Sequence, residues 1–172
     1  MHINVYSVVI LFALLFEYAL GLVADSLNLR HVSEAVPQEF AEIYPEAEYA
    51  RSQRYLRAST RFGLVCATWD LGILLVAWFA GGFAGLDLWC GKQTASPLLQ
   101  GVLFIGILAA AKTLLGLPFS AYATFVLEQR FGFNRTRWGT FVLDRAKGLG
   151  LAVLLGLPLL AAVLWFFDTA GS

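Results

Sequence analysis

Four long stretches of this 172-residue chain are almost free of charged side chains, and this feature restricts its fold more than any other. The stretches are Ile3 to Ala24, Phe62 to Leu86, Gln93 to Leu127 and Gly148 to Phe167. About 20 consecutive apolar residues suffice for a helix to cross a bilayer, so each stretch is long enough. We expect an all-α integral membrane protein that forms a single membrane domain over residues 1–172. Its four transmembrane helices are expected to span about residues 3–24, 62–84, 97–119 and 148–167.

Composition supports this class of protein. Hydrophobic residues make up 59% of the chain and charged residues 14%, against ~45–50% and ~25% in soluble domains. The 12 basic residues balance the 12 acidic ones, so no basic field favours nucleic acid as a partner. The first stretch could instead be a signal peptide, but it lacks a positively charged leading segment and contains Glu17.

The basic residues predict an orientation in the membrane. Five lie in residues 25–61 and five in residues 128–147, which together hold ten of the twelve. Because short loops rich in Lys and Arg stay in the cytoplasm, we expect these two segments there and both termini on the opposite side. The abundance of Ala, Leu and Gly favours a bacterial inner membrane over the endoplasmic reticulum.

The first cytoplasmic segment is expected to contain a juxtamembrane helix. Pro45 suits a helix start, Glu46 and Glu48 suit its first turn, and no Pro or Gly follows before Gly63. The helix should therefore continue into the second membrane span. Arginines recur on it at three- and four-residue steps and form one basic stripe, namely Arg51, Arg54, Arg57 and Arg61. The stripe could contact anionic lipid heads or an acidic partner, or it could be a solvated face.

The third loop contains a distinctive motif from Glu128 to Thr136. Gly132 between Phe131 and Phe133 indicates a tight turn between two apolar anchors. Asn134 or Thr136 is expected to cap the helix that follows.

Three charged residues lie inside the apolar stretches, namely Glu17, Asp70 and Lys112. Counted from the cytoplasmic ends of their helices, all three lie roughly 10–12 Å deep in the same leaflet. They could meet inside the bundle or line a water-filled cavity, since buried charge in a membrane is costly. Alternatively, each occupies its own polar pocket, or an ion pair among them only fixes helix packing.

No catalytic or metal-binding motif is recognisable in the sequence. There is no His-Glu-x-x-His helix, no Gly-x-Ser-x-Gly elbow and no phosphate-binding loop. The two histidines, His2 and His31, lie far apart in the chain, and the two cysteines, Cys66 and Cys90, are too few for a zinc site or a disulfide framework.

Taken in order, several segments resemble the amino-terminal membrane region of type I CAAX prenyl proteases. They are Leu27 to Arg30, Val36 to Phe40, Tyr44 to Tyr55, Arg57 to Gly63, Trp78 to Phe83, Leu117 to Ser120 and Glu128 to Thr136. The resemblance implies a larger integral-membrane zinc metalloprotease with seven helices around a water-filled chamber. In that family, zinc is held by the histidines of His-Glu-x-x-His and a later glutamate. The resemblance implies removal of the terminal tripeptide of prenylated CAAX proteins by the complete enzyme in eukaryotes, and processing or degradation of other membrane-associated peptides by bacterial relatives.

The residues that would hold zinc lie downstream of the region that this chain resembles. We therefore expect no cofactor in this chain and no proteolysis by it alone. Its expected partners are the lipid bilayer, the catalytic region in cis or in trans, and a peptide or prenylated protein substrate. The alternative is a stand-alone four-helix membrane scaffold or small carrier.

Overall fold

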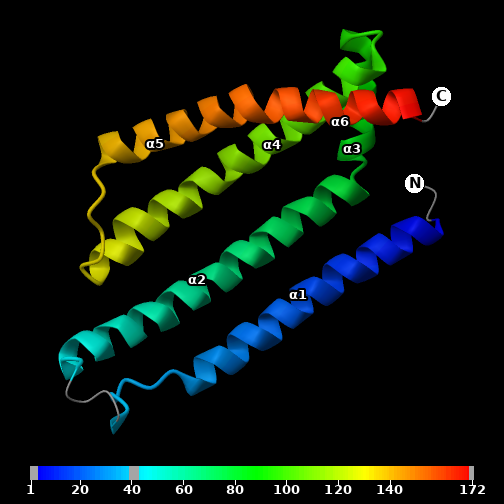
Figure 1. Cartoon of the computed structure of the whole chain (residues 1–172). Coiled ribbons are helices and arrows are strands. Elements are labelled where there is room, and N and C mark those ends of the chain that lie inside the picture. The colour runs from blue at the N-terminus through cyan, green and yellow to red at the C-terminus, as the bar shows by residue number, and fades with distance from the viewer. Residues whose placement is uncertain (1–3, 39–42, 171–172) are drawn as a thin grey trace. The chain divides into compact units, whose positions relative to one another are not determined.

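The computed structural model describes residues 4–38 and 43–170, and the described part of the chain is helical, with no strand (Figure 1). Its helices are α1 (Val5–His31), α2 (Glu46–Phe79), α3 (Gly82–Gln93), α4 (Pro97–Tyr122), α5 (Trp138–Leu151) and α6 (Leu157–Ala170). Two π-helical turns, η2 (Ala123–Glu128) and η3 (Ala152–Gly156), follow α4 and α5. Four helical segments are long and apolar enough to cross a membrane, which confirms the predicted fold class.

The chain divides into two compact units. The first comprises Met1–Ala80 and Ala121–Asn134, and the second comprises Gly81–Ser120 and Arg135–Ser172. Each unit is therefore described by itself.

In the first unit, α1 and α2 pack as an antiparallel pair (Figure 1). Asn4 caps the start of α1, because its side-chain oxygen accepts a hydrogen bond of 2.8 Å from the backbone amide of Ser7. Midway along the pair, the hydroxyl of Tyr18 lies 2.7 Å from that of Thr68. Thr68 also donates to the carbonyl of Leu64 at 2.7 Å, so this polar contact is satisfied within an apolar stretch.

Helix α2 is one continuous helix of 34 residues that starts directly after Pro45. This confirms the predicted juxtamembrane extension of the second span. At 1.5 Å per residue the helix is about 51 Å long, whereas the hydrocarbon core is about 30 Å thick. Its first part must therefore project beyond the hydrocarbon.

The second span ends earlier than predicted. We expected it to reach residue 84, but α2 stops at Phe79 and Gly81 takes a positive φ of 74°. A left-handed residue cannot continue an α-helix, so the chain turns and begins α3, which the sequence did not indicate. With 12 residues, or about 18 Å, α3 is too short to cross the bilayer.

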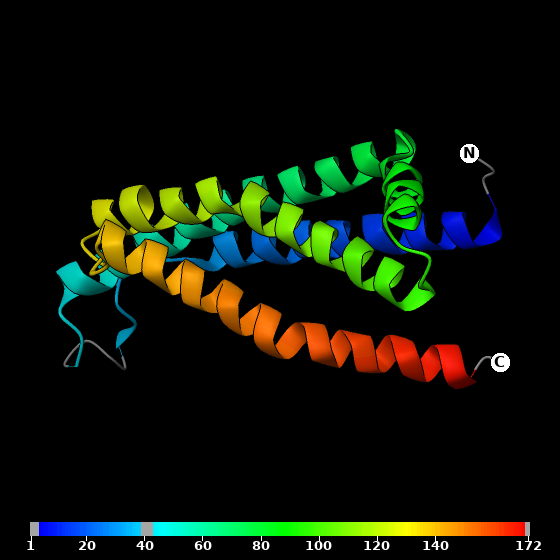
Figure 2. The ribbon, with the colours of Figure 1, turned by 90° about the horizontal axis from the view of Figure 1, so that it is seen from above.

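In the second unit, two contacts join helices distant in sequence. The side-chain amide nitrogen (Nε2) of Gln100 on α4 donates a hydrogen bond of 2.8 Å to a carboxylate oxygen of Asp87 on α3. Further along, a Cβ built on Gly101 would lie 3.0 Å from a methyl carbon of Leu164 on α6, so the missing side chain permits this close approach. Helices α5 and α6 follow one another through η3 as a single curved segment (Figure 2).

Most of the apolar surface of these helices is uncovered by the rest of the chain. None of the most apolar 18-residue windows of the four long helices contains a buried residue. Among the described residues only Cys90 is fully buried. Such faces are stable against lipid or against further protein, and they are not the faces of a water-soluble bundle.

Candidate functional site

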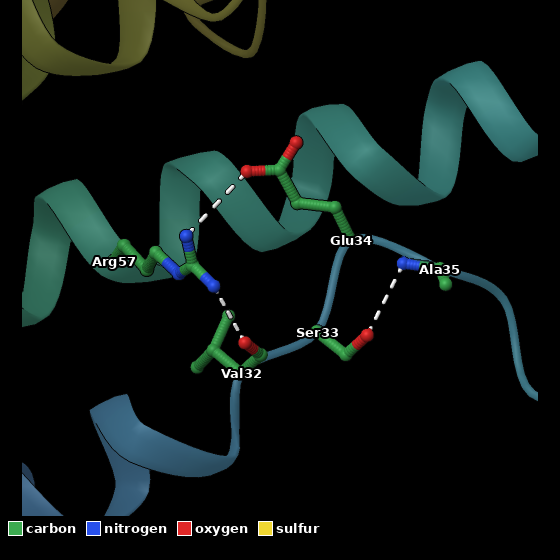
Figure 3. A network of polar contacts seen from close by, with 5 residues as sticks. All are labelled: Val32, Ser33, Glu34, Ala35 and Arg57. Atoms are coloured by element: carbon green, nitrogen blue, oxygen red, sulfur yellow. Dashed lines mark hydrogen bonds and ion pairs between the residues drawn. The ribbon is translucent and has the colours of Figure 1, made fainter.

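Arg57 joins the end of α1 to the projecting part of α2 (Figure 3). Its Nη2 donates a hydrogen bond of 2.6 Å to the carbonyl of Val32, the residue that ends α1. Its Nη1 lies 3.5 Å from a carboxylate oxygen of Glu34, in a pair whose side chains are 40% and 43% exposed. The guanidinium thus satisfies a helix-terminal carbonyl that has no partner within its own helix.

Another member of the basic stripe contacts the loop after η2. The guanidinium of Arg51 lies 5.5 Å from the ring centre of Phe133, a cation–π contact. The ring of Tyr55, one turn further along α2, lies 5.7 Å from that of Phe131 and 4.9 Å from that of Phe133. The two phenylalanines of the motif therefore flank one tyrosine of α2.

The turn itself is a Schellman motif centred on Gly132. Gly132 takes a φ of 76°, and its amide donates to the carbonyl of Gln129 at 3.1 Å. The amide of Phe133 donates to the carbonyl of Glu128 at 2.9 Å, and the amide of Asn134 donates to the same carbonyl at 3.3 Å. These bonds satisfy the last carbonyls of the helix and place both phenylalanines toward α2.

The predicted cap of the next helix is wrong. Helix α5 begins at Trp138, and its N-cap residue is Arg137, whose side chain makes no capping hydrogen bond. Neither Asn134 nor Thr136 occupies that position. After the Schellman motif the chain continues without helix through residue 137, where Arg137 is extended, so α5 starts beyond both side chains.

The other two arginines of the stripe differ from Arg51 and Arg57. Arg54 and Arg61 are exposed and make no hydrogen bond or ion pair with another described residue. Arg51 and Arg57 thus contact the neighbours of α2, whereas Arg54 and Arg61, on the same side of the helix, have no hydrogen bond or ion pair with the described residues.

Two of the three intramembrane charges can be placed relative to each other. Glu17 precedes Tyr18 by one residue, and Asp70 follows Thr68 by two, so in an antiparallel pair both lie on the same side of the Tyr18–Thr68 contact. At 1.5 Å per residue their levels differ by only ~2 Å. Both side chains are exposed, as is Lys112 on α4 of the second unit. Their meeting as a cluster stays a prediction.

The described residues do not fit a metal site. Among them, no group of three or more His, Cys, Asp and Glu side chains could hold a metal ion.

Some residues of this region were not singled out from their spacing. Tyr18 and Thr68 are polar residues within apolar stretches, and Tyr55 lies between two arginines of the stripe. The signal that could have found the first two is the proximity of each to a charged residue, Glu17 or Asp70.

The part of the chain that the structure describes has four helices of membrane-spanning length, as in an integral membrane protein. Residues 25–172 match the family described as "CAAX prenyl protease N-terminal, five membrane helices". The chain therefore belongs to this family of membrane proteins.

Known relatives agree with this assignment. The CAAX prenyl protease 1 homologue of Taenia solium is 27% identical over 98% of this chain, and the CAAX prenyl protease 1 of Saccharomyces cerevisiae is 29% identical over 77% of it. The crystal structure of Ste24p from S. mikatae is 25% identical and superposes over 92% of the chain with a TM-score of 0.83.

The matched region is only part of each relative. It covers 39% of the Taenia protein, 32% of the yeast protein and 38% of the Ste24p chain. The chain thus spans less than half the length of the proteins that it resembles.

Proposed function

We propose that this chain forms the amino-terminal part of the membrane chamber of a CAAX-type zinc metalloprotease, and that the zinc and the catalytic residues belong to the portion outside it. The single observation that carries this proposal is the match of residues 25–172 to the amino-terminal region of that family. The chain aligns with 39% or less of the length of each of these relatives, which fits a catalytic portion outside this chain.

The chain's own contribution would be structural and electrostatic. The uncovered apolar faces provide contact with lipid and with the remaining membrane helices. Glu17 and Asp70 would face chamber water, because a carboxylate in contact with lipid near the membrane interior is costly. Lys112, counted to a similar depth in the sequence, would also point to the interior.

The proposed setting follows from the same reasoning. The chain would lie in a bacterial inner membrane. Its arginine-rich segments would be on the cytoplasmic side, and both termini would be on the opposite side. The partners would be the catalytic region, in cis or in trans, and a peptide or prenylated protein substrate.

Proteolysis of a prenylated CAAX peptide tests the proposal. Membranes that contain the 172-residue chain alone should release no tripeptide. Membranes in which the chain is joined to a His-Glu-x-x-His region read from the same locus should release it, and a metal chelator should abolish the release. Cleavage by the chain alone would contradict the proposal. A stable chain with no such region in its own or a neighbouring reading frame would favour the scaffold or carrier instead.

A further inference from the structure

Arg54 and Arg61 of α2 form a small cationic surface that makes no hydrogen bond or ion pair with residues 4–38 and 43–170. Arg54 and Arg61 are seven residues apart, so they lie within about 20° of each other on the helix and about 10 Å apart along it. Both are exposed, and from Tyr49 to Trp69 this helix carries no acidic residue. Glu34 is the one described carboxylate within ion-pair distance of the stripe, and it is paired with Arg57.

The position of this pair along the helix is set by the apolar span that follows. Residues 62–79 of α2 are 18 residues, or about 27 Å, which nearly fills the hydrocarbon core of about 30 Å. Arg61 therefore lies at the boundary of the hydrocarbon, and Arg54 lies about two turns further out. A long arginine side chain can bend back to the headgroup layer from that position.

The other two arginines of the stripe already have partners, and their contacts join α2 to its neighbours. Arg57 is bound to Val32 and Glu34, and Arg51 is stacked on Phe133. The free pair is thus presented by a helix fixed at two points, and less side-chain and helix ordering is needed when a ligand binds.

We propose that Arg54 and Arg61 bind the headgroup of an anionic phospholipid of the leaflet that faces the loops. The guanidinium fork matches a phosphate oxygen pair, and two adjacent positive charges favour a headgroup of net negative charge over a zwitterionic one. The proposal concerns lipid alone and does not depend on the proteolytic role.

Native mass spectrometry of the delipidated 172-residue chain in neutral detergent tests this inference. The probes are phosphatidylglycerol and phosphatidylcholine with identical acyl chains. We expect the first bound phosphatidylglycerol to be retained in preference to phosphatidylcholine. An arginine near the surface contributes about fivefold to such binding, so Arg54→Gln with Arg61→Gln should weaken it by about 25-fold if the two act independently. Each single variant should weaken it by about fivefold.

Two matched variants separate a site from bulk charge. Arg135→Gln with Arg137→Gln removes the same charge from the loop before α5 and should leave phosphatidylglycerol binding within twofold of wild type. Arg54→Lys with Arg61→Lys keeps the charge but loses the guanidinium fork, so it should bind phosphatidylglycerol more tightly than the double glutamine variant and more weakly than wild type. Because the four substituted arginines are exposed and none has a hydrogen bond or ion pair with another described residue, all variants should keep the wild-type midpoint of thermal unfolding.

Three results would overturn the proposal. Equal retention of the two lipids would mean that other groups of the protein cover these arginines. Equal weakening by both pairs of glutamine variants would show attraction to net charge only. Displacement of the lipid by millimolar inorganic phosphate, or retention of an acidic peptide in its place, would assign the surface to a soluble ligand.

Discussion

Gly132 provides the sharpest test of the turn that joins η2 to the loop beside α2. Its φ of 76° is in the left-handed region, where a residue with a Cβ loses about 1–2 kcal/mol. A Cβ added there would meet only Arg51 Nη1 at 3.8 Å, an ordinary contact. The cost of Gly132→Ala is therefore conformational, and we expect a loss of about 1–2 kcal/mol in the free energy of unfolding.

The control is the same substitution at Gly63. That glycine lies inside α2 at negative φ, and a Cβ there would meet nothing within 4 Å. Because alanine is favoured over glycine in a helix interior, Gly63→Ala should stabilise by about 0.5–1 kcal/mol. The two identical changes should thus differ in sign and by about 1.5–3 kcal/mol.

The measurement is equilibrium unfolding of the chain in mixed micelles with increasing SDS, followed by tryptophan fluorescence. Gly132→Asn should lose less than Gly132→Ala, because asparagine tolerates the left-handed conformation better. If Gly132→Ala proves as stable as Gly63→Ala, the Schellman motif does not hold the turn and the reasoning is refuted.

Three further predictions concern the helix pair, the intramembrane charges and the topology. Arg57→Ala should lower the free energy of unfolding by about 1–2 kcal/mol in the same assay, because a charged donor to the helix-terminal carbonyl of Val32 is lost. Glu34→Gln should lower it by less than about 1 kcal/mol, since the Arg57–Glu34 pair is about 40% exposed. An equal loss for both variants would contradict the dominance of the Arg57–Val32 hydrogen bond. If the intramembrane charges interact, Lys112→Met should destabilise wild type more than a Glu17→Gln background; a double-mutant cycle should give about 0.5–3 kcal/mol, and zero coupling with both acids would leave no cluster. Single cysteines at Arg54 and Arg135 should be labelled by impermeant reagents from the cytoplasmic side only, and cysteines at Trp89 and Asp168 from the other side only; labelling of position 54 from the far side would overturn the topology.

The sequence was most informative where a single physical requirement dominates. A run of about 20 uncharged residues has few alternatives to a membrane helix, so the four long helices follow from it directly. The extension of α2 follows from Pro45, the acids after it and the absence of helix breakers. The Phe131-Gly132-Phe133 sequence indicated the turn, because glycine alone adopts positive φ at no cost.

The parts that could not be predicted depend on neighbours distant in the sequence. Gly81 and Gly82 lie in an apolar run where membrane helices tolerate glycine, so hydropathy did not mark the break before α3. The basic stripe looked uniform because its members share one face. Only the contacts of Arg57 with Val32, and of Arg51 with Phe133, separate the structural arginines from the free ones.

The most direct test of the central claim is the water accessibility of Glu17 and Asp70 in the chain joined to its catalytic region. With Cys66 and Cys90 replaced by serine, single cysteines at 17 and 70 should react with a charged, membrane-impermeant thiol reagent, as expected for a wall of an aqueous chamber. A cysteine at Val65, an exposed apolar position of α2, serves as the control for contact with lipid. Reaction of positions 17 and 70 with lipid-soluble reagents alone, in a protein that still cleaves peptide, would contradict the account.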